Sequence, residues 1–117
     1  MEKLVCVAHN KAVTNTEIIA KYFARSHNEI IHALRDLKRD CGATFSKENF
    51  IEQDNTDLHW ITCAGFLILS GLFMGSRDAR FKIIFFDAFA KAQEEISDSK
   101  HNIPQTVRDE LSSLHAI

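Results

Sequence analysis

The sequence predicts one small α+β domain, and three observations indicate this fold. The chain has 117 residues, of which 45% are hydrophobic and 26% charged, enough for a single core of ordinary size. Short apolar runs bounded by turn residues predict strands at residues 4–8 and 50–61. Apolar residues with helical spacing dominate residues 15–42 and 62–96. We therefore expect a domain over residues 1–97, with residues 98–117 as a linker and a short C-terminal helix or mobile tail.

The first elements are predicted from a change of pattern near residue 15. Residues 4–8 contain β-branched side chains and precede the turn-prone residues 9–11, so a short strand is expected there. A helix should follow, capped by Thr14 or Asn15 and ending near residue 24. Its apolar positions are Ile18, Ile19, Tyr22 and Phe23.

A second helix is predicted from its start and stop signals. Ser26 and Glu29 have the spacing of a capping box, in which the serine hydroxyl accepts a hydrogen bond from a backbone amide of the first turn. Gly42 suits a C-terminal position that needs a positive φ. The apolar stripe that we expect to be buried consists of Ile30, Ile31, Leu34 and Leu37.

The second half of the chain predicts a hairpin followed by two helices. Residues 50–61 have strand-like ends around the turn-rich residues 54–57, which favours a β-hairpin. Thr62 is a suitable cap for an apolar helix over residues 63–73. A longer helix is expected over residues 77–96, after Gly75-Ser76. Its apolar stripe contains Phe81, Ile84, Phe85, Ala88, Phe89 and Ala92.

The stripe of this last helix has two interpretations. A helix with so wide an apolar face either lies at the centre of its own core or packs against the same helix of a second copy. The sequence leaves both open, and a homodimer through the helix of residues 77–96 is one expected partnership.

Two short helices joined by a tight turn, followed by a hairpin, predict a small winged helix-turn-helix domain with C-terminal helices. The helix-turn-helix would span residues 13–39. On the second helix, four residues off the apolar stripe share one face and could contact bases: Asn28, His32, Arg35 and Arg39. Four others would lie near phosphates: Arg25, Ser26, His27 and Lys38. An ordinary solvated helix face is the alternative interpretation.

Charge constrains how such a surface could work. Residues 11–39 carry six basic and three acidic side chains, a local balance of 6 − 3 = +3, whereas the whole chain has a net charge of −2. Binding to nucleic acid would therefore depend on one face that presents its cations together. Asp54 and Asp57 at the hairpin turn would repel phosphate, so the wing is expected either to be structural or to face a protein.

Other function classes have little support in the sequence. Cys6, Cys41 and Cys63 are widely spaced, and we expect three reduced, buried thiols rather than a zinc site. The six histidines have no metal-ligand spacing. One enzymatic alternative stays open, a pair formed by Cys63 and His59. No signal or membrane-spanning segment is predicted, so a cytoplasmic location is expected.

Several ordered segments resemble the phage regulatory protein Rha family over residues 13–96. The stretch VTNTEIIAKYFARSHNEIIHALRDL is similar to that family's opening, with His27 at the start of the second helix. The family's later segments are similar to three further stretches of this chain: FSKENF with the hairpin, the WITxxGFxxL run, and GSRDARFKIIFFDAF. The family commonly has a Gly-Arg pair at the hairpin turn, where this chain has Asp-Asn-Thr-Asp.

The resemblance implies prophage-encoded regulation through double-stranded DNA, without catalysis and without a cofactor. Together with the residues, it predicts a DNA-binding transcriptional regulator. The alternative is an antirepressor-like antagonist that captures a phage or host regulatory protein.

Overall fold

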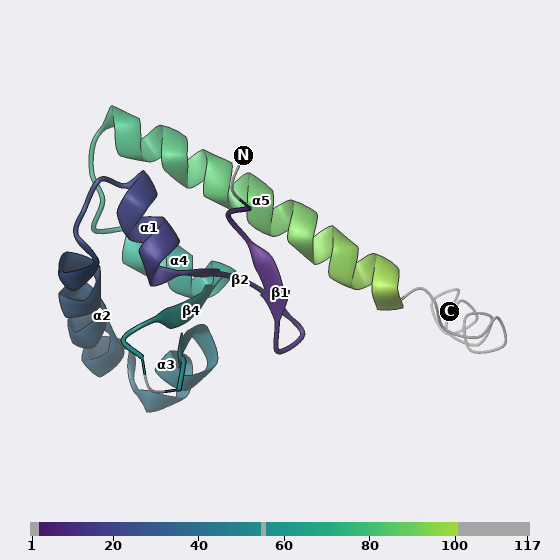
Figure 1. Cartoon of the computed structure of the whole chain (residues 1–117), viewed down its shortest axis with the longest axis horizontal. Helices are drawn as coiled ribbons and strands as arrows, with labels where there is room; N and C mark the ends of the chain where they lie inside the picture. Colours follow the sequence, from purple (N-terminus) through teal and green to yellow (C-terminus); the bar gives the residue numbers. More distant parts are fainter. Residues whose placement is uncertain (1–2, 55, 101–117) are drawn as a thin grey trace, which may run out of the picture.

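The structure is a computed structural model that describes residues 3–54 and 56–100. These residues form an antiparallel sheet of four strands together with five helices, which confirms the α+β class (Figure 1). The elements in chain order are β1 (Cys6–Ala8), β2 (Lys11–Asn15), α1 (Thr16–Tyr22), α2 (His27–Cys41), α3 (Ala43–Asn49), β3 (Phe50–Glu52), β4 (His59–Thr62), α4 (Cys63–Ser70) and α5 (Ser76–Lys100).

The sheet has the order β1-β2-β4-β3, and every neighbouring pair is antiparallel. The predicted hairpin is confirmed as β3 and β4, with Phe50 opposite Ile61. β2 was not predicted, because a turn and a helix cap were expected at these residues. It lies between β1 and β4 and pairs Val13 with Thr62. The turn from β1 to β2 holds two residues at positive φ, His9 and Asn10.

The α1–α2 pair begins as the capping signals predicted. The Asn15 side chain accepts a hydrogen bond from the amide of Ile18 at 2.9 Å, and the Ser26 hydroxyl accepts one from the amide of Glu29 at 3.1 Å. Gly42 ends α2 at φ 87°. In the short turn between the helices, Ala24 has a φ of 53°, a conformation that usually favours glycine.

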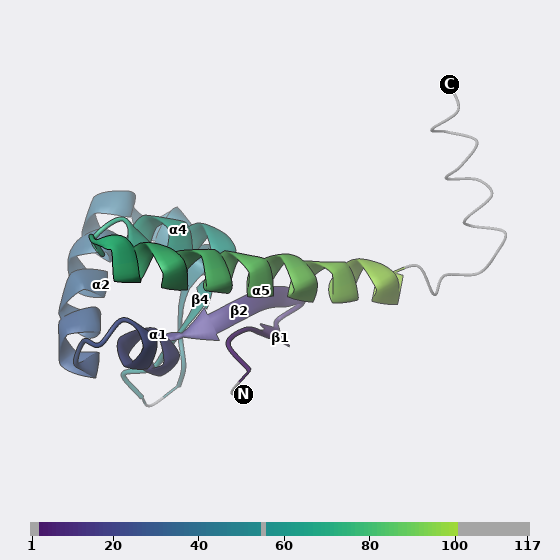
Figure 2. The same cartoon turned by 90° about the horizontal axis from the view of Figure 1, so that it is seen from above.

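The remaining helices differ from the prediction in their limits. α3 was not predicted, and α4 ends at Ser70 rather than near residue 73. α5 begins one residue early and continues through residues 97–100, where a linker was expected, so that assignment was wrong. Figures 1 and 2 show the C-terminal part of α5 projecting beyond the rest of the domain. The short helix expected after residue 100 lies outside the described residues.

The core is a cluster of aromatic side chains between α1, α4 and α5. The Phe85 ring lies 4.9 Å from that of Phe66 and 5.6 Å from that of Phe23, measured between centroids. Phe89, Ala92 and Ile96 of α5 are also buried in the hydrophobic core. Most of the apolar stripe of α5 therefore packs into the chain's own core. The prediction that Ile84 belongs to this buried stripe was wrong, because the residue is 46% exposed.

All three cysteines are free thiols. The prediction that they are buried was wrong, because Cys6 and Cys41 are only partly buried and Cys63 is exposed.

Within residues 3–54 and 56–100, no helix combines the length and the apolar composition that crossing a membrane requires.

Candidate nucleic-acid interface

The exposed side of α2 forms one ridge, which consists of Asn28, His32, Arg35 and Arg39. All four residues are exposed, and their spacing of four, three and four places them on one face of the helix. The opposite side carries Ile30 and Leu34, both buried against α1 and the core. The sequence thus predicted correctly which four side chains share this face.

The two arginines of the ridge differ in their surroundings. Arg39 lies 3.5 Å from carboxylate oxygens of both Asp36 and Asp40, and all three side chains are largely exposed. Exposed pairs of this kind contribute only about 0–1 kcal/mol, so they hold Arg39 weakly. Arg35 has no ion-pair partner among residues 3–54 and 56–100. It is the cation of the ridge most available to a ligand.

Arg25 does not lie on this surface as a free cation. Its guanidinium donates to the backbone oxygen of Phe23 at 3.0 Å and to Asp78 at 3.3 Å, and it lies over the ring of Phe73. These contacts tie the α1–α2 turn to the start of α5. Of the four residues expected near phosphates, Arg25 is therefore the one whose guanidinium is engaged in contacts with the start of α5.

Ser26 and His27 are engaged at the base of α2. Ser26 caps the helix, and His27 Nε2 is hydrogen-bonded to the Thr16 hydroxyl at 2.8 Å. The same hydroxyl oxygen accepts a hydrogen bond from the amide of His59 at 3.3 Å. Thr16 therefore joins α1, α2 and β4 at one point, and His27 is half-buried there.

Lys38 connects α2 to the hairpin. Its Nζ donates to Glu52 Oε1 at 2.7 Å and to His59 Nε2 at 2.9 Å. Because an ammonium group can only donate, His59 Nε2 must accept, and the ring proton lies on Nδ1, which donates to the Asp57 carbonyl at 2.9 Å. Sequence reasoning missed this link. Its only signal is the cross-strand pairing of Glu52 with His59, which depends on the hairpin register.

These contacts shift two pKa values. Burial is the main cause that lowers the pKa of His59; the hydrogen bond to Asp57 opposes the shift, and the charge of Lys38 adds to it. The hydrogen bond and charge of Lys38 lower the pKa of the Glu52 carboxyl. At neutral pH the group therefore consists of a cationic lysine, a neutral histidine and a carboxylate.

We expect the folded state to lose stability as the pH falls below the ordinary histidine range. The folded pKa of His59 lies below its unfolded value of 6.5, so the unfolded chain takes up this proton first. The stability that the neutral His59 ring contributes is complete above the unfolded pKa and is lost as the pH falls through the folded pKa. Urea unfolding at pH 7.5 and 5.5 measures the effect, with His59→Gln as the comparison because the two proteins differ in this one side chain. An equal pH dependence in the two proteins would contradict this role of His59.

The hairpin beside α2 is acidic. Residues 50–62 contain Glu52, Asp54 and Asp57 and no lysine or arginine, which gives −3, whereas α2 has three basic and three acidic side chains, 3 − 3 = 0. A cleft of about 230 Å³ separates the two elements and is lined by groups that include Arg35, Lys38 and Asp57. A polyanion approaching the ridge would therefore meet cations on α2 and repulsion at the hairpin.

His59, the base of the enzymatic alternative, has other partners in the structure. Both ring nitrogens of His59 are occupied by Lys38 and Asp57, and partial burial raises the pKa of the Cys63 thiol. The described part of the chain also brings together no group of three histidine, cysteine or carboxylate side chains that could hold a metal ion.

No protein-family model matches the chain, and no curated protein or solved structure matches it either.

Proposed function

We propose that the protein is a DNA-binding transcriptional regulator of phage type, with α2 as its recognition helix and the β3–β4 hairpin as a wing. The observation that carries this proposal is the ridge of α2, a continuous exposed row on a capped helix. A turn of four residues joins α1 to α2, and α1 packs against the buried side of α2. In helix-turn-helix proteins this arrangement lets the second helix enter a major groove.

The connections around α2 support a winged arrangement. The chain passes from β2 through α1, α2 and α3 to the hairpin, and β4 returns to pair with β2. The Lys38 contacts with Glu52 and His59 fix the hairpin beside α2. The resemblance to the Rha family adds the expectation of a prophage regulator.

The ridge supplies suitable chemistry for base recognition. Arginine can donate two hydrogen bonds to guanine, and asparagine can pair with adenine. We assign these roles to Arg35 and Asn28, with His32 and Arg39 beside them. Arg39 must leave two exposed carboxylates to reach a ligand, which costs little.

Arg35→Ala is expected to weaken binding to a duplex enriched by this protein from a random pool by about 1–3 kcal/mol, roughly 5- to 150-fold. Fluorescence anisotropy at two salt concentrations measures the loss. Arg80→Ala is the matched control, because Arg80 is exposed on α5, outside the ridge. Equal affinities of the two variants would remove the ridge from the interface, and failure to enrich any duplex would contradict DNA binding itself.

One observation favours a second candidate, an antagonist that binds a regulatory protein. The hairpin and α2 together carry a net charge of −3, which suits a basic protein surface better than phosphate. The double variant Asp54→Asn/Asp57→Asn separates the two functions. It should strengthen binding to DNA by removing repulsion, whereas it should weaken capture of a basic partner.

A further inference from the structure

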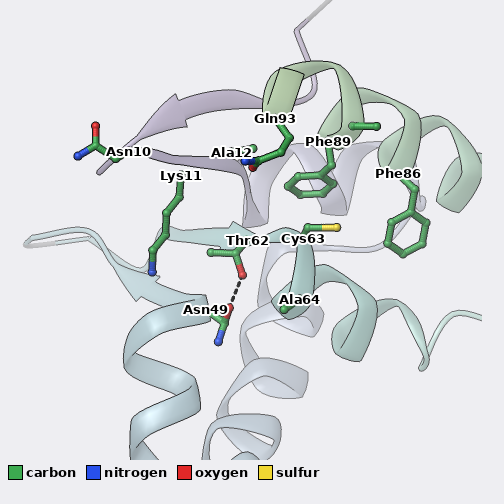
Figure 3. Close-up of a pocket in the computed structure, with 11 residues that line it drawn as sticks. Asn10, Lys11, Ala12, Asn49, Thr62, Cys63, Ala64, Phe86, Phe89 and Gln93 are labelled. Atoms are coloured by element: carbon green, nitrogen blue, oxygen red, sulfur yellow. Dashed lines mark hydrogen bonds between the residues drawn. The ribbon is translucent and has the colours of Figure 1, made fainter. Parts of the chain in front are cut away.

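A cavity of about 440 Å³ lies on a part of the molecule that the proposed function does not use. It is bounded by the start of β2, the end of α3, the start of α4 and the middle of α5, and no residue of α1 or α2 lines it. Figure 3 shows side chains from all four elements facing one another across it. Its volume falls in the range of small-molecule pockets, about 300–1,000 Å³.

One wall of the cavity is aromatic and rigid. Phe89 is buried at the centre of the core, and Phe86 packs edge-on against Phe66 at a centroid distance of 5.2 Å. Ala64 and Ala90 continue this apolar lining. Because these rings are held by the core, the wall exists before any ligand arrives, which reduces the entropy lost on binding.

The opposite side carries one positive charge and one fixed side-chain amide. The Lys11 ammonium donates to the backbone oxygen of Glu48 at 3.1 Å. The Asn49 side chain is fixed at both ends, since it accepts from the Thr62 hydroxyl at 2.6 Å and donates to the oxygen of Phe45 at 3.0 Å. Figure 3 shows Lys11 extending along this side of the cavity toward Asn49.

The charge in the cavity is unbalanced. Within the described residues, no carboxylate pairs with Lys11, and none of the lining side chains is acidic. An exposed cation without a counter-ion therefore lies at the edge of a partly apolar cavity, in a protein whose net charge is −2. The first turn of α4, at Cys63 and Ala64, adds the positive end of a helix dipole to the same lining.

We propose that this cavity binds a small monocarboxylic acid with an apolar body. The carboxylate pairs with the Lys11 ammonium, and the body lies against Phe86 and Phe89. A neutral analogue loses the ion pair, and a polyanion such as nucleic acid is too large for the cavity. This binding does not depend on the proposed contact with DNA.

The test uses 4-phenylbutanoate and its uncharged analogue 4-phenylbutan-1-ol as probes of the full chain. Amide chemical shifts, followed by nuclear magnetic resonance, are expected to change on titration with the acid at Lys11, Ala64 and Phe86, and to saturate. Lys11→Met should weaken binding of the acid roughly tenfold or more and leave binding of the alcohol unchanged. Lys47→Met, with the same change of charge outside the cavity, is the control.

A blocking variant keeps the test independent of Lys11. Ala90 is exposed at the cavity wall, so Ala90→Trp should fill the space without disturbing the core and should abolish binding of both probes. The proposal is overturned if the wild-type cavity residues show no saturable shift with the acid. It is also overturned if Lys11→Met binds the acid as well as the wild type, or if Ala90→Trp still binds it.

Discussion

Phe85→Ala is expected to lower the free energy of unfolding by about 3–5 kcal/mol, the usual cost of removing a buried aromatic ring. Phe85 is fully buried and contacts three other aromatic rings, which belong to Tyr22, Phe23 and Phe66. These rings come from α1, the turn after it and α4. Loss of the Phe85 ring therefore leaves a cavity where α5 joins the other two helices.

Urea unfolding followed by circular dichroism measures this loss. Ile83→Ala is the control, because Ile83 lies two residues earlier on α5 and is 68% exposed. Its substitution should change stability by about 0.5 kcal/mol or less, as is usual for surface positions. If both variants lost the same free energy, the aromatic cluster would not be what holds α5 on the domain.

Gly65→Ala is expected to destabilise the protein by about 3 kcal/mol, at the upper end of the range for overpacking. In an uncrowded helix the same change would stabilise by about 1 kcal/mol, because alanine is the better helix former. Here the added methyl group would lie 2.5 Å from the backbone oxygen of Asn49 and 3.1 Å from the Phe50 ring. A backbone atom cannot rotate away, so α4 would have to move away from the end of α3.

Thermal unfolding of Gly65→Ala and of Ala64→Gly checks this explanation. Ala64 is exposed one residue earlier in α4, so its change to glycine should cost only the ordinary helix propensity, about 1 kcal/mol. A Gly65→Ala protein as stable as the wild type would show that α4 and α3 can separate at little cost.

The parts of the fold that local chemistry determines were predicted correctly. Asn15, Ser26 and Thr62 each cap the helix that follows, because a short polar side chain there accepts from a backbone amide three residues later. The β3–β4 hairpin follows from a polar turn between apolar strands. The exposed ridge of α2 follows from helical periodicity alone.

The parts that depend on distant partners were missed. β2 has five residues, and its central place in the sheet comes from pairing with β4, far along the chain. α3 has no apolar stripe of its own, and no element was predicted at its residues. The candidate site shows the same limit, since the contacts of Arg25 with Asp78 and of Lys38 with Glu52 decide which cations stay available. Neither contact has a signal in the local sequence.

The order of the strands also has a consequence for the route by which the chain folds. The β1–β2 and β3–β4 hairpins and the α1–α2 pair each join neighbouring segments, which need only short loops to close. The β2–β4 pairing instead encloses α1, α2, α3 and β3, so its loop-closure entropy is lost before its contacts are gained. The pairing of β2 with β4, rather than the formation of either hairpin, should therefore limit the rate of folding.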